Sequence, residues 1–276
     1  MTLSRADVRR LLADHGLRPS RALGQHFVTD PNTVRRIARL AGVGLGDRVV
    51  EVGAGLGSLT LALAETGADV VAVELDRHLV PVLTGVVEGT GAVVVQADAL
   101  VLDWDDLLGD DASGWSLVAN LPYNVATPIV LRVLEEAPQV GRLLVMVQRE
   151  VAERLAAGPG DPAYGAPSVR VAYYATASLV GRVPASVFYP RPAVESALVA
   201  IARRPEPAVD PALVDEDRLF GLVRAGFAQR RKMLRRSLEG LVAPEAFSEA
   251  GVPPTARAEE LGVEAWGRLA AAGRGG

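Results

Sequence analysis

The chain has 276 residues, of which 49% are hydrophobic, with a formal net charge of −4 and no cysteine. The lack of cysteine excludes disulfides, cysteine-ligated zinc and a thiol nucleophile, and the three histidines lack the spacing of a metal site, so no metal is expected. No apolar run reaches the roughly 18 residues of a membrane span, and the N-terminus lacks the layout of a secretion signal. We therefore expect a cytoplasmic protein with no membrane partner.

Helices are predicted over Leu3–Asp14 and Pro31–Ala41, the second with Asp30 as its N-cap and proline at its first position. Apolar segments then alternate with helical patterns and are predicted to be strands: Arg48–Val52, Asp69–Glu74, Ala92–Val95, Ser116–Ala119 and Arg142–Val147. This alternation is typical of an α/β fold in which helices cover both faces of a parallel sheet.

A proline-rich linker, Arg203–Pro211, separates two patterns. Before it we predict a helix, a loop and a closing pair of strands, over Gln148–Ala157, Gly158–Pro167, Ala177–Val183 and Ala197–Ala202. After it only helical patterns follow, and we expect Leu234, Leu238 and Leu241 to share one inward face. The predicted domains are residues 1–204, with the sheet, and residues 205–276, all helical.

A glycine-rich turn, Gly53-Ala-Gly-Leu-Gly57, joins the first predicted strand to a helix, and glycine lets backbone approach a ligand closely. A dinucleotide-binding fingerprint would have glycine at residue 58, where this chain has Ser58. Glu74 lies 21 residues after Gly53, where a carboxylate can bind both hydroxyls of a ribose. The alternative for Glu74 is a helix-capping or solvated acid. Asp98 ends the third strand.

The segment Asn120-Leu-Pro-Tyr123 follows the fourth predicted strand. The carboxyl ends of strands are where ligands bind in open α/β sheets. The Asn120 oxygen and the carbonyls of Leu121 or Pro122 can accept hydrogen bonds from an amino group, and the ring of Tyr123 can stack on a flat base. Asn and Pro are also ordinary turn residues, so the segment alone leaves a simple turn open.

In this order the motifs resemble the rRNA adenine N6-dimethyltransferases, in their small-subunit (KsgA-type) branch. The resemblance covers nearly the whole chain and rests on Leu23–Asp30, Glu51–Thr60, Ala72–Asp76, Asp98–Leu100, Asn120–Tyr123, Phe188–Ser196 and Phe227–Leu234. Two positions depart from the family pattern. His26 stands where the family usually has Asn, which helps to hold the cofactor, and Val28 stands where it usually has Leu. A neutral imidazole still makes one hydrogen bond as donor or acceptor.

The resemblance implies a Rossmann-like methyltransferase domain, a small helical domain, and S-adenosylmethionine as methyl donor. It implies a cofactor site with Glu74 at the ribose and Asp98 at the adenine, made of His26, Val28, Gly53, Gly55, Glu74, Asp98 and Asn120. The acceptor adenine would be held by hydrogen bonds to Asn120 and to the carbonyls of Leu121 or Pro122. The ring of Tyr123 would stack on one face of the adenine and that of Phe188 on the other.

The implied substrate is small-subunit (16S) rRNA, dimethylated by a monomeric enzyme at two adjacent adenosines near its 3′ end. The segment Arg224–Arg236 contains no acid and includes the single lysine of the chain, Lys232. It resembles a family helix, so we predict one continuous helix over Arg230–Arg236. RNA contacts are expected from Arg230, Arg231, Lys232 and Arg235.

Three other functions stay open. A large-subunit (23S) rRNA methyltransferase of the macrolide-resistance type shares most of these motifs. A ribosome-assembly RNA-binding factor with a vestigial methyltransferase site is a second possibility, although retention of Gly53, Glu74, Asp98 and Asn120 argues against it. An NAD-dependent oxidoreductase is disfavoured by Ser58 and by Asn120–Tyr123.

Overall fold

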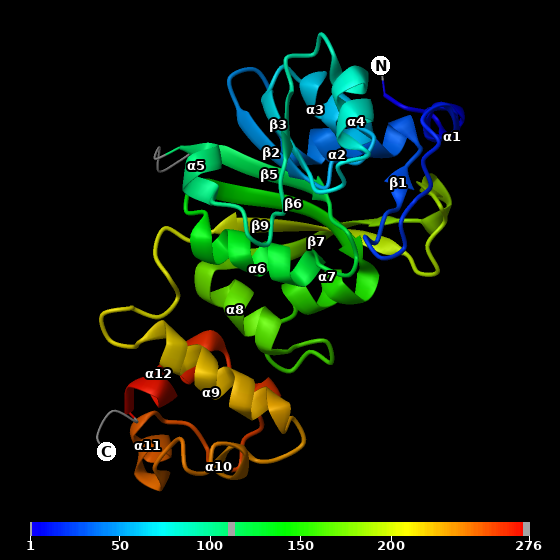
Figure 1. The fold of residues 1–276 in the computed structure, drawn as a ribbon. Helices are drawn as coiled ribbons and strands as arrows, with labels where there is room; N and C mark the ends of the chain where they lie inside the picture. The colour runs from blue at the N-terminus through cyan, green and yellow to red at the C-terminus, as the bar shows by residue number, and fades with distance from the viewer. Residues whose placement is uncertain (1, 110–113, 273–276) are drawn as a thin grey trace. The chain divides into compact units, whose positions relative to one another are not determined.

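The computed structural model describes residues 2–109 and 114–272. The chain divides into two compact units (Figure 1). The first unit is Met1–Ala152 with Ser178–Ala202, and the second is Glu153–Ala177 with Arg203–Gly276. The predicted division at residue 204 did not anticipate that Glu153–Ala177 belongs to the second unit.

A seven-stranded sheet forms the centre of the fold, in the order β4-β3-β2-β5-β6-β9-β7. Neighbours from β4 to β6 are parallel, and β9 runs antiparallel to β6. The strands are β2 (Arg48–Val52), β3 (Asp69–Glu74), β4 (Val93–Gln96), β5 (Trp115–Asn120), β6 (Val140–Gln148), β7 (Ala175–Val183) and β9 (Ser196–Arg203). The α/β fold class and the predicted strands are thus confirmed, with ends that shift by a residue or two.

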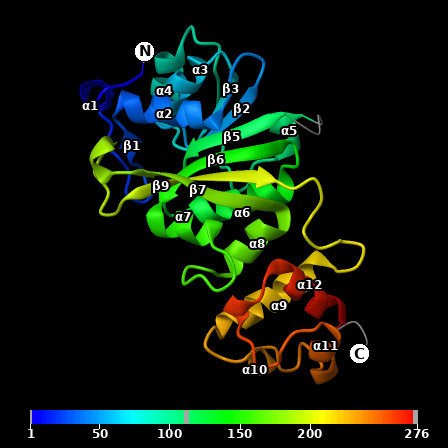
Figure 2. The ribbon, with the colours of Figure 1, turned by 180° about the vertical axis from the view of Figure 1, so that it is seen from behind.

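Both faces of the central strands are buried. Consecutive residues of β5 point to opposite faces, yet Leu117, Val118 and Ala119 are at most 1% exposed. On one face, Ile37 and Leu63 pack with Val118 in a single apolar cluster. The helices of the first unit are α1 (Arg5–Asp14), α2 (Pro31–Ala41), α3 (Ser58–Ala64), α4 (Val80–Val87), α5 (Trp104–Leu108) and α6 (Ala126–Glu136), shown from behind in Figure 2. Helix α7 (Arg149–Ala156) begins in the first unit and ends in the second.

A small second sheet joins two segments that are far apart in the sequence. Strand β1 (Phe27–Val28) pairs antiparallel with β8 (Phe188–Tyr189), which follows the 3₁₀ turn η1 (Ala185–Val187). Residue Val28 lies opposite Phe188, and the amide of Thr29 donates to the carbonyl of Val187 at 2.8 Å. The pairing brings the motif around His26 beside the loop that follows Phe188.

The second unit is helical and has its own core, centred on Trp266, which is fully buried among Phe220, Leu234 and Leu238. A Cβ at Gly226 would lie 2.6 Å from the Trp266 ring, so only glycine fits there. Its helices are α8 (Ala166–Tyr174), α9 (Glu216–Ala228), α10 (Leu234–Ser237), α11 (Pro244–Glu249), the 3₁₀ turn η2 (Ala258–Glu260) and α12 (Val263–Ala272).

Three predictions for this part of the chain were wrong. Arg230–Arg236 is not one helix, because α9 ends at Ala228 and α10 starts only at Leu234. Leu241 is 51% exposed, while Leu234 and Leu238 are fully buried, because α10 ends before the helical spacing reaches residue 241. The predicted loop ending at Pro167 is shorter, because α8 begins at Ala166.

Candidate active site

A cavity lies at the carboxyl ends of the parallel strands, where the loops after β2, β3, β4 and β5 meet. The structure brings most of the sequence-predicted site residues together in its lining: His26, Val28, Gly53, Gly55, Glu74, Asp98, Asn120, Leu121, Pro122 and Tyr123. Phe188 is not among them. All the residues that line this cavity belong to the first unit.

The glycine turn after β2 forms one wall of the cavity. Gly53 and Gly55 have φ angles of 74° and 60°, a region that L side chains rarely adopt. A Cβ at Gly55 would also lie 3.0 Å from the ring of Phe27. The turn therefore needs glycine for its conformation and for close packing.

Glu74, at the end of β3, is held rigidly and is only 7% exposed. Its Oε2 accepts a hydrogen bond from the amide of Gly55 at 2.7 Å, and its Oε1 accepts one from the amide of Asp76 at 2.9 Å. Burial raises the pKa of Glu74, and the backbone donors partly oppose that rise. Each oxygen keeps a lone pair for a ligand, so the carboxylate can still accept from two hydroxyls.

Glu51 lines the same cavity and was not predicted as a site residue. It is 1% exposed and accepts a hydrogen bond from Thr60 Oγ1 at 2.6 Å. Burial raises its pKa to about 8, the Thr60 bond opposes the rise, and the nearby Glu74 adds to it. The available signal in the sequence was an acid between the apolar residues Val50 and Val52 of a predicted strand.

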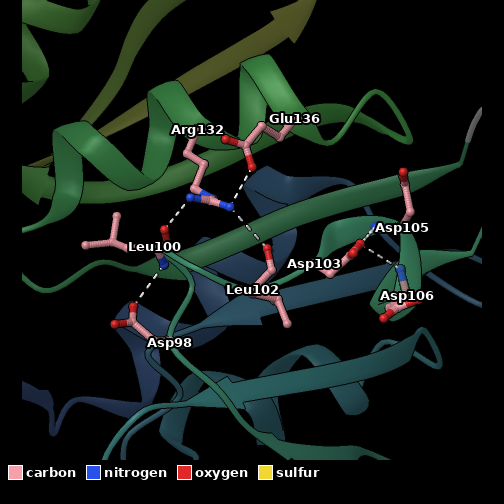
Figure 3. Close-up of polar contacts among 8 residues, drawn as sticks. All are labelled: Asp98, Leu100, Leu102, Asp103, Asp105, Asp106, Arg132 and Glu136. Carbon is pink, nitrogen blue, oxygen red and sulfur yellow. Dashed lines mark hydrogen bonds and ion pairs between the residues drawn. The ribbon is translucent and has the colours of Figure 1, made fainter.

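Asp98 and Leu75 line another part of the cavity. The Asp98 Oδ1 accepts a hydrogen bond from the amide of Leu100 at 2.9 Å, which fixes the direction of its carboxylate (Figure 3). Leu75 is 47% exposed although it is apolar. A carboxylate beside an exposed apolar side chain suits a flat heterocycle that carries an amino group.

The side-chain amide of Asn120 is oriented by the backbone of a distant motif. Its Nδ2 donates to the carbonyl of His26 at 3.0 Å, which leaves Oδ1 pointing away from that carbonyl. Asn120 Oδ1 is buried and has no hydrogen-bond partner. A buried acceptor without a donor is costly and rare in native proteins, so this atom is suited to a ligand that brings an N–H group.

Tyr123 is fixed by contacts at both its ring and its hydroxyl. Its ring stacks on the imidazole of His26, with centroids 5.1 Å apart and planes inclined by 28°. Its hydroxyl lies 2.6 Å from Ser196 Oγ, and burial raises its pKa. His26 Nδ1 lies 2.8 Å from the carbonyl of Pro190, an acceptor, so Nδ1 carries a proton. The predicted contact of the His26 side chain with a cofactor would therefore be made by its other ring nitrogen, Nε2.

Phe188 does not lie where the stacking prediction placed it. Its side chain is fully buried in the cluster that also contains Val28, Ile37 and Met146. The pairing of β1 with β8 turns this ring into the core, so it presents no face to the cavity in this structure. The ring that the structure places against Tyr123 is the imidazole of His26.

In the second unit, the predicted RNA-binding residues lie on a turn and on the short helix that follows it. Arg230 is bound to Glu259 at 2.6 Å and donates to the carbonyl of Pro162 at 2.9 Å. Arg231, Lys232 and Arg235 are exposed. All four residues are thus exposed, and Arg230 is in addition held by its contacts with Glu259 and Pro162.

Within residues 2–109 and 114–272, no group of three or more His, Asp or Glu side chains is arranged to hold a metal ion. No helix in that part of the chain has the length and apolar character needed to cross a membrane.

Comparison with known proteins gives consistent matches over almost the whole chain. The family model described as ribosomal RNA adenine dimethylase matches residues 17–272. A protein of Cutibacterium acnes named ribosomal RNA small subunit methyltransferase A is 50% identical, over 95% of this chain and 91% of its own length. A protein of the same name from Bifidobacterium longum subsp. infantis is 49% identical, over 98% and 93%.

Two solved structures share the fold. The 23S rRNA methyltransferase ErmE has a TM-score of 0.69 and 26% identity, over 90% of this chain and 99% of its own. A dimethyladenosine transferase from Plasmodium falciparum has a TM-score of 0.74 and 21% identity, over 88% and 95%.

Proposed function

Because the chain belongs to the ribosomal RNA adenine dimethylase family, we propose that it transfers methyl groups from S-adenosylmethionine to adenine N6 in small-subunit (16S) rRNA. Two methyl groups would go to each of two adjacent adenosines near the 3′ end. The observation that carries this proposal is the buried, unpartnered Oδ1 of Asn120 in a cavity that also presents Glu74 and Asp98.

Adenine N6 is a poor nucleophile because its lone pair is delocalised into the ring. Asn120 Oδ1 would accept a hydrogen bond from one N6–H, and a backbone carbonyl of Leu121 or Pro122 would accept one from the other. The Pro122 carbonyl already accepts the amide of Val125 at 3.2 Å, which holds the turn in place. Two acceptors on the amine bring it toward tetrahedral geometry and direct its lone pair at the methyl group. Catalysis is then positioning plus preorganised dipoles.

The residues present fit the methyl donor. The donor supplies a methyl group on a sulfonium sulfur, already activated for attack. Glu74 would bind its ribose hydroxyls, Asp98 its adenine amino group, and the turn at Gly53 and Gly55 its methionine end. The donor has no pyrophosphate, which agrees with Ser58 in place of the last glycine of a dinucleotide fingerprint. Transfer would break the methyl carbon–sulfur bond, leave S-adenosylhomocysteine and form an N–C bond, and the proton released from N6 would pass to solvent.

The target base leaves its stack to reach the cavity. Tyr123 would hold it by stacking, a contact that is worth roughly 1–3 kcal/mol for each base. His26 already stacks on one face of the Tyr123 ring, with the two ring centroids 5.1 Å apart, so the base would stack on the opposite face. Phe188 is buried, so it does not supply the second stacking surface that the resemblance implied for the base.

The choice of subunit rests on the degree of similarity. Relatives named for the small subunit are 49–50% identical over nearly their whole length, whereas the 23S rRNA enzyme ErmE is 26% identical. This difference in sequence identity disfavours the large-subunit alternative.

The exposed cations Arg231, Lys232 and Arg235 would bind phosphates of the RNA.

Replacing Asn120 by alanine tests the proposal. Loss of a preorganised acceptor at the reacting centre should lower the rate of methyl transfer about 10²–10³-fold. Asn32→Ala is the control, because Asn32 is an exposed asparagine of α2 that does not line the cavity. Single-turnover transfer to undermethylated small subunits would be measured for both variants. Equal activity of Asn120→Ala and Asn32→Ala would overturn the assignment of Asn120.

A further inference from the structure

The segment between β4 and α5, Asp98–Asp103, has no strand partner and is held by turns of its own. The amides of Val101 and Leu102 donate to the Asp98 carbonyl at 3.0 and 2.8 Å, and the amide of Leu100 donates to its carboxylate at 2.9 Å. At the other end, Asp103 caps α5 through the amides of residues 105 and 106 (Figure 3). The direction of the Asp98 carboxylate therefore depends on the shape of this one segment.

Arg132 of helix α6 binds the backbone of this segment (Figure 3). Its guanidinium donates through Nη1 to the carbonyl of Leu100 and through Nη2 to that of Leu102 at 3.4 Å. Glu136, one turn further along α6, pairs with the same guanidinium at 2.6 Å. The planar, rigid fork of arginine suits two carbonyls at once, which the single ammonium of lysine does not match.

Helix α6 is a firm anchor for that contact. Val130 and Val133, on either side of Arg132, are fully buried. Ile129, one turn before Arg132, lines the cavity, and the helix starts three residues after Tyr123. Arg132 thus connects the turn that carries Asp98 to the helix that follows the acceptor motif.

We propose that Arg132 is a positioning residue: by clamping the carbonyls of Leu100 and Leu102, it holds the Asp98 carboxylate against the amino group of the donor's adenine and so sets the selectivity of the donor site for adenine. This inference rests on the proposed function, since it takes S-adenosylmethionine as the donor. Without the clamp, the Asp98–Asp103 turn keeps its internal bonds but loses its fixed distance from α6. The carboxylate would then no longer be preorganised for one amino group.

Calorimetry with two donor analogues tests this assignment. S-adenosylhomocysteine carries the adenine amino group, and S-inosylhomocysteine carries an oxo group in its place. The wild-type protein should prefer the adenosyl compound by about tenfold or more, the size of one charge-assisted hydrogen bond. Arg132→Gln should lose roughly tenfold in affinity for the adenosyl compound and less than about twofold for the inosyl compound.

Two more variants separate this effect from a general loss of structure. Arg132→Lys keeps the charge but not the fork, and should fall between wild type and Arg132→Gln in selectivity. Arg35→Gln removes an exposed ion pair with Glu65, 3.1 Å long, and should leave both affinities unchanged. Thermal unfolding would confirm that each variant is folded.

The outcomes are distinguishable. Equal weakening of both analogues in Arg132→Gln, or no change in either, would overturn the positioning role while leaving the proposed function intact. Failure of the wild-type protein to bind S-adenosylhomocysteine at all would instead overturn the proposed donor.

Discussion

At the scale of single residues, Asn120 and Tyr123 are each directed by partners from distant parts of the chain. The carbonyl that orients the Asn120 amide belongs to His26, 94 residues away in sequence. The hydroxyl of Tyr123 pairs with Ser196, 73 residues away. The acceptor pocket is thus a product of tertiary contacts, although its key side chains lie in one short segment.

The hydroxyl of Tyr123 and its ring should have separable effects. Tyr123→Phe removes one hydrogen bond, worth about 0.5–1.5 kcal/mol, and should keep methyl transfer within about tenfold of wild type. Tyr123→Ala removes the stacking surface and should lose roughly ten times more than Tyr123→Phe. Ser196→Ala breaks the same hydrogen bond from the other side and should behave like Tyr123→Phe. Steady-state rates on small subunits would decide, and a Tyr123→Phe variant as inactive as Tyr123→Ala would show that the hydroxyl takes part in the chemistry.

Glu51 should make stability depend on pH. Burial raises its pKa from 4.5 to about 8, so the folded protein binds the proton more tightly than the unfolded chain. Its stabilising contribution is complete below about pH 4.5 and is lost as the pH rises toward 8. Glu51→Gln removes this titration while keeping an acceptor for Thr60.

Urea unfolding of wild type and Glu51→Gln would measure the effect. The free energy of unfolding of wild type, relative to the variant, should fall between about pH 5 and pH 8, by at most about 1.4 kcal/mol for each pH unit. A difference that stays constant across that range would show that Glu51 is not buried as an acid.

At the scale of secondary-structure elements, local sequence predicted most of the fold, because strand and helix patterns repeat over short distances. The strands that carry Glu74 and Asn120 and the glycine turn at Gly53 all follow such patterns. The burial of Phe188 could not be predicted in this way, because it depends on the pairing of β1 with β8. Likewise, the break between α9 and α10 depends on the packing of Leu234 and Leu238 in the second unit.

The exposed cations around α10 should contribute to RNA affinity and not to donor binding. Replacing Arg231, Lys232 and Arg235 by glutamine should weaken RNA binding and reduce the slope of log affinity against log salt by up to about three. Arg230 is left intact because its pairing with Glu259 supports the local fold. Affinity for S-adenosylhomocysteine should stay the same, since the residues that line its proposed site belong to the first unit. An unchanged salt slope would identify the cluster as a solvated surface.

At the scale of the whole molecule, the chain combines a catalytic unit with a helical unit that has its own core. The protein has a net charge of −4, so phosphate attraction over its whole surface is weak. We expect it to rely on the shape of a ribonucleoprotein particle, because structured RNA is recognised largely by shape. Assembled small subunits should therefore be better substrates than naked rRNA.

Transfer of labelled methyl groups from S-adenosylmethionine to purified ribosomal particles tests the proposed substrate. Undermethylated small subunits and large subunits would be incubated separately with the protein, and the modified nucleosides identified by mass spectrometry. We expect N6,N6-dimethyladenosine at adjacent adenosines near the 3′ end of the small-subunit RNA, and little label in the large subunit. Label found mainly in large-subunit RNA would contradict it.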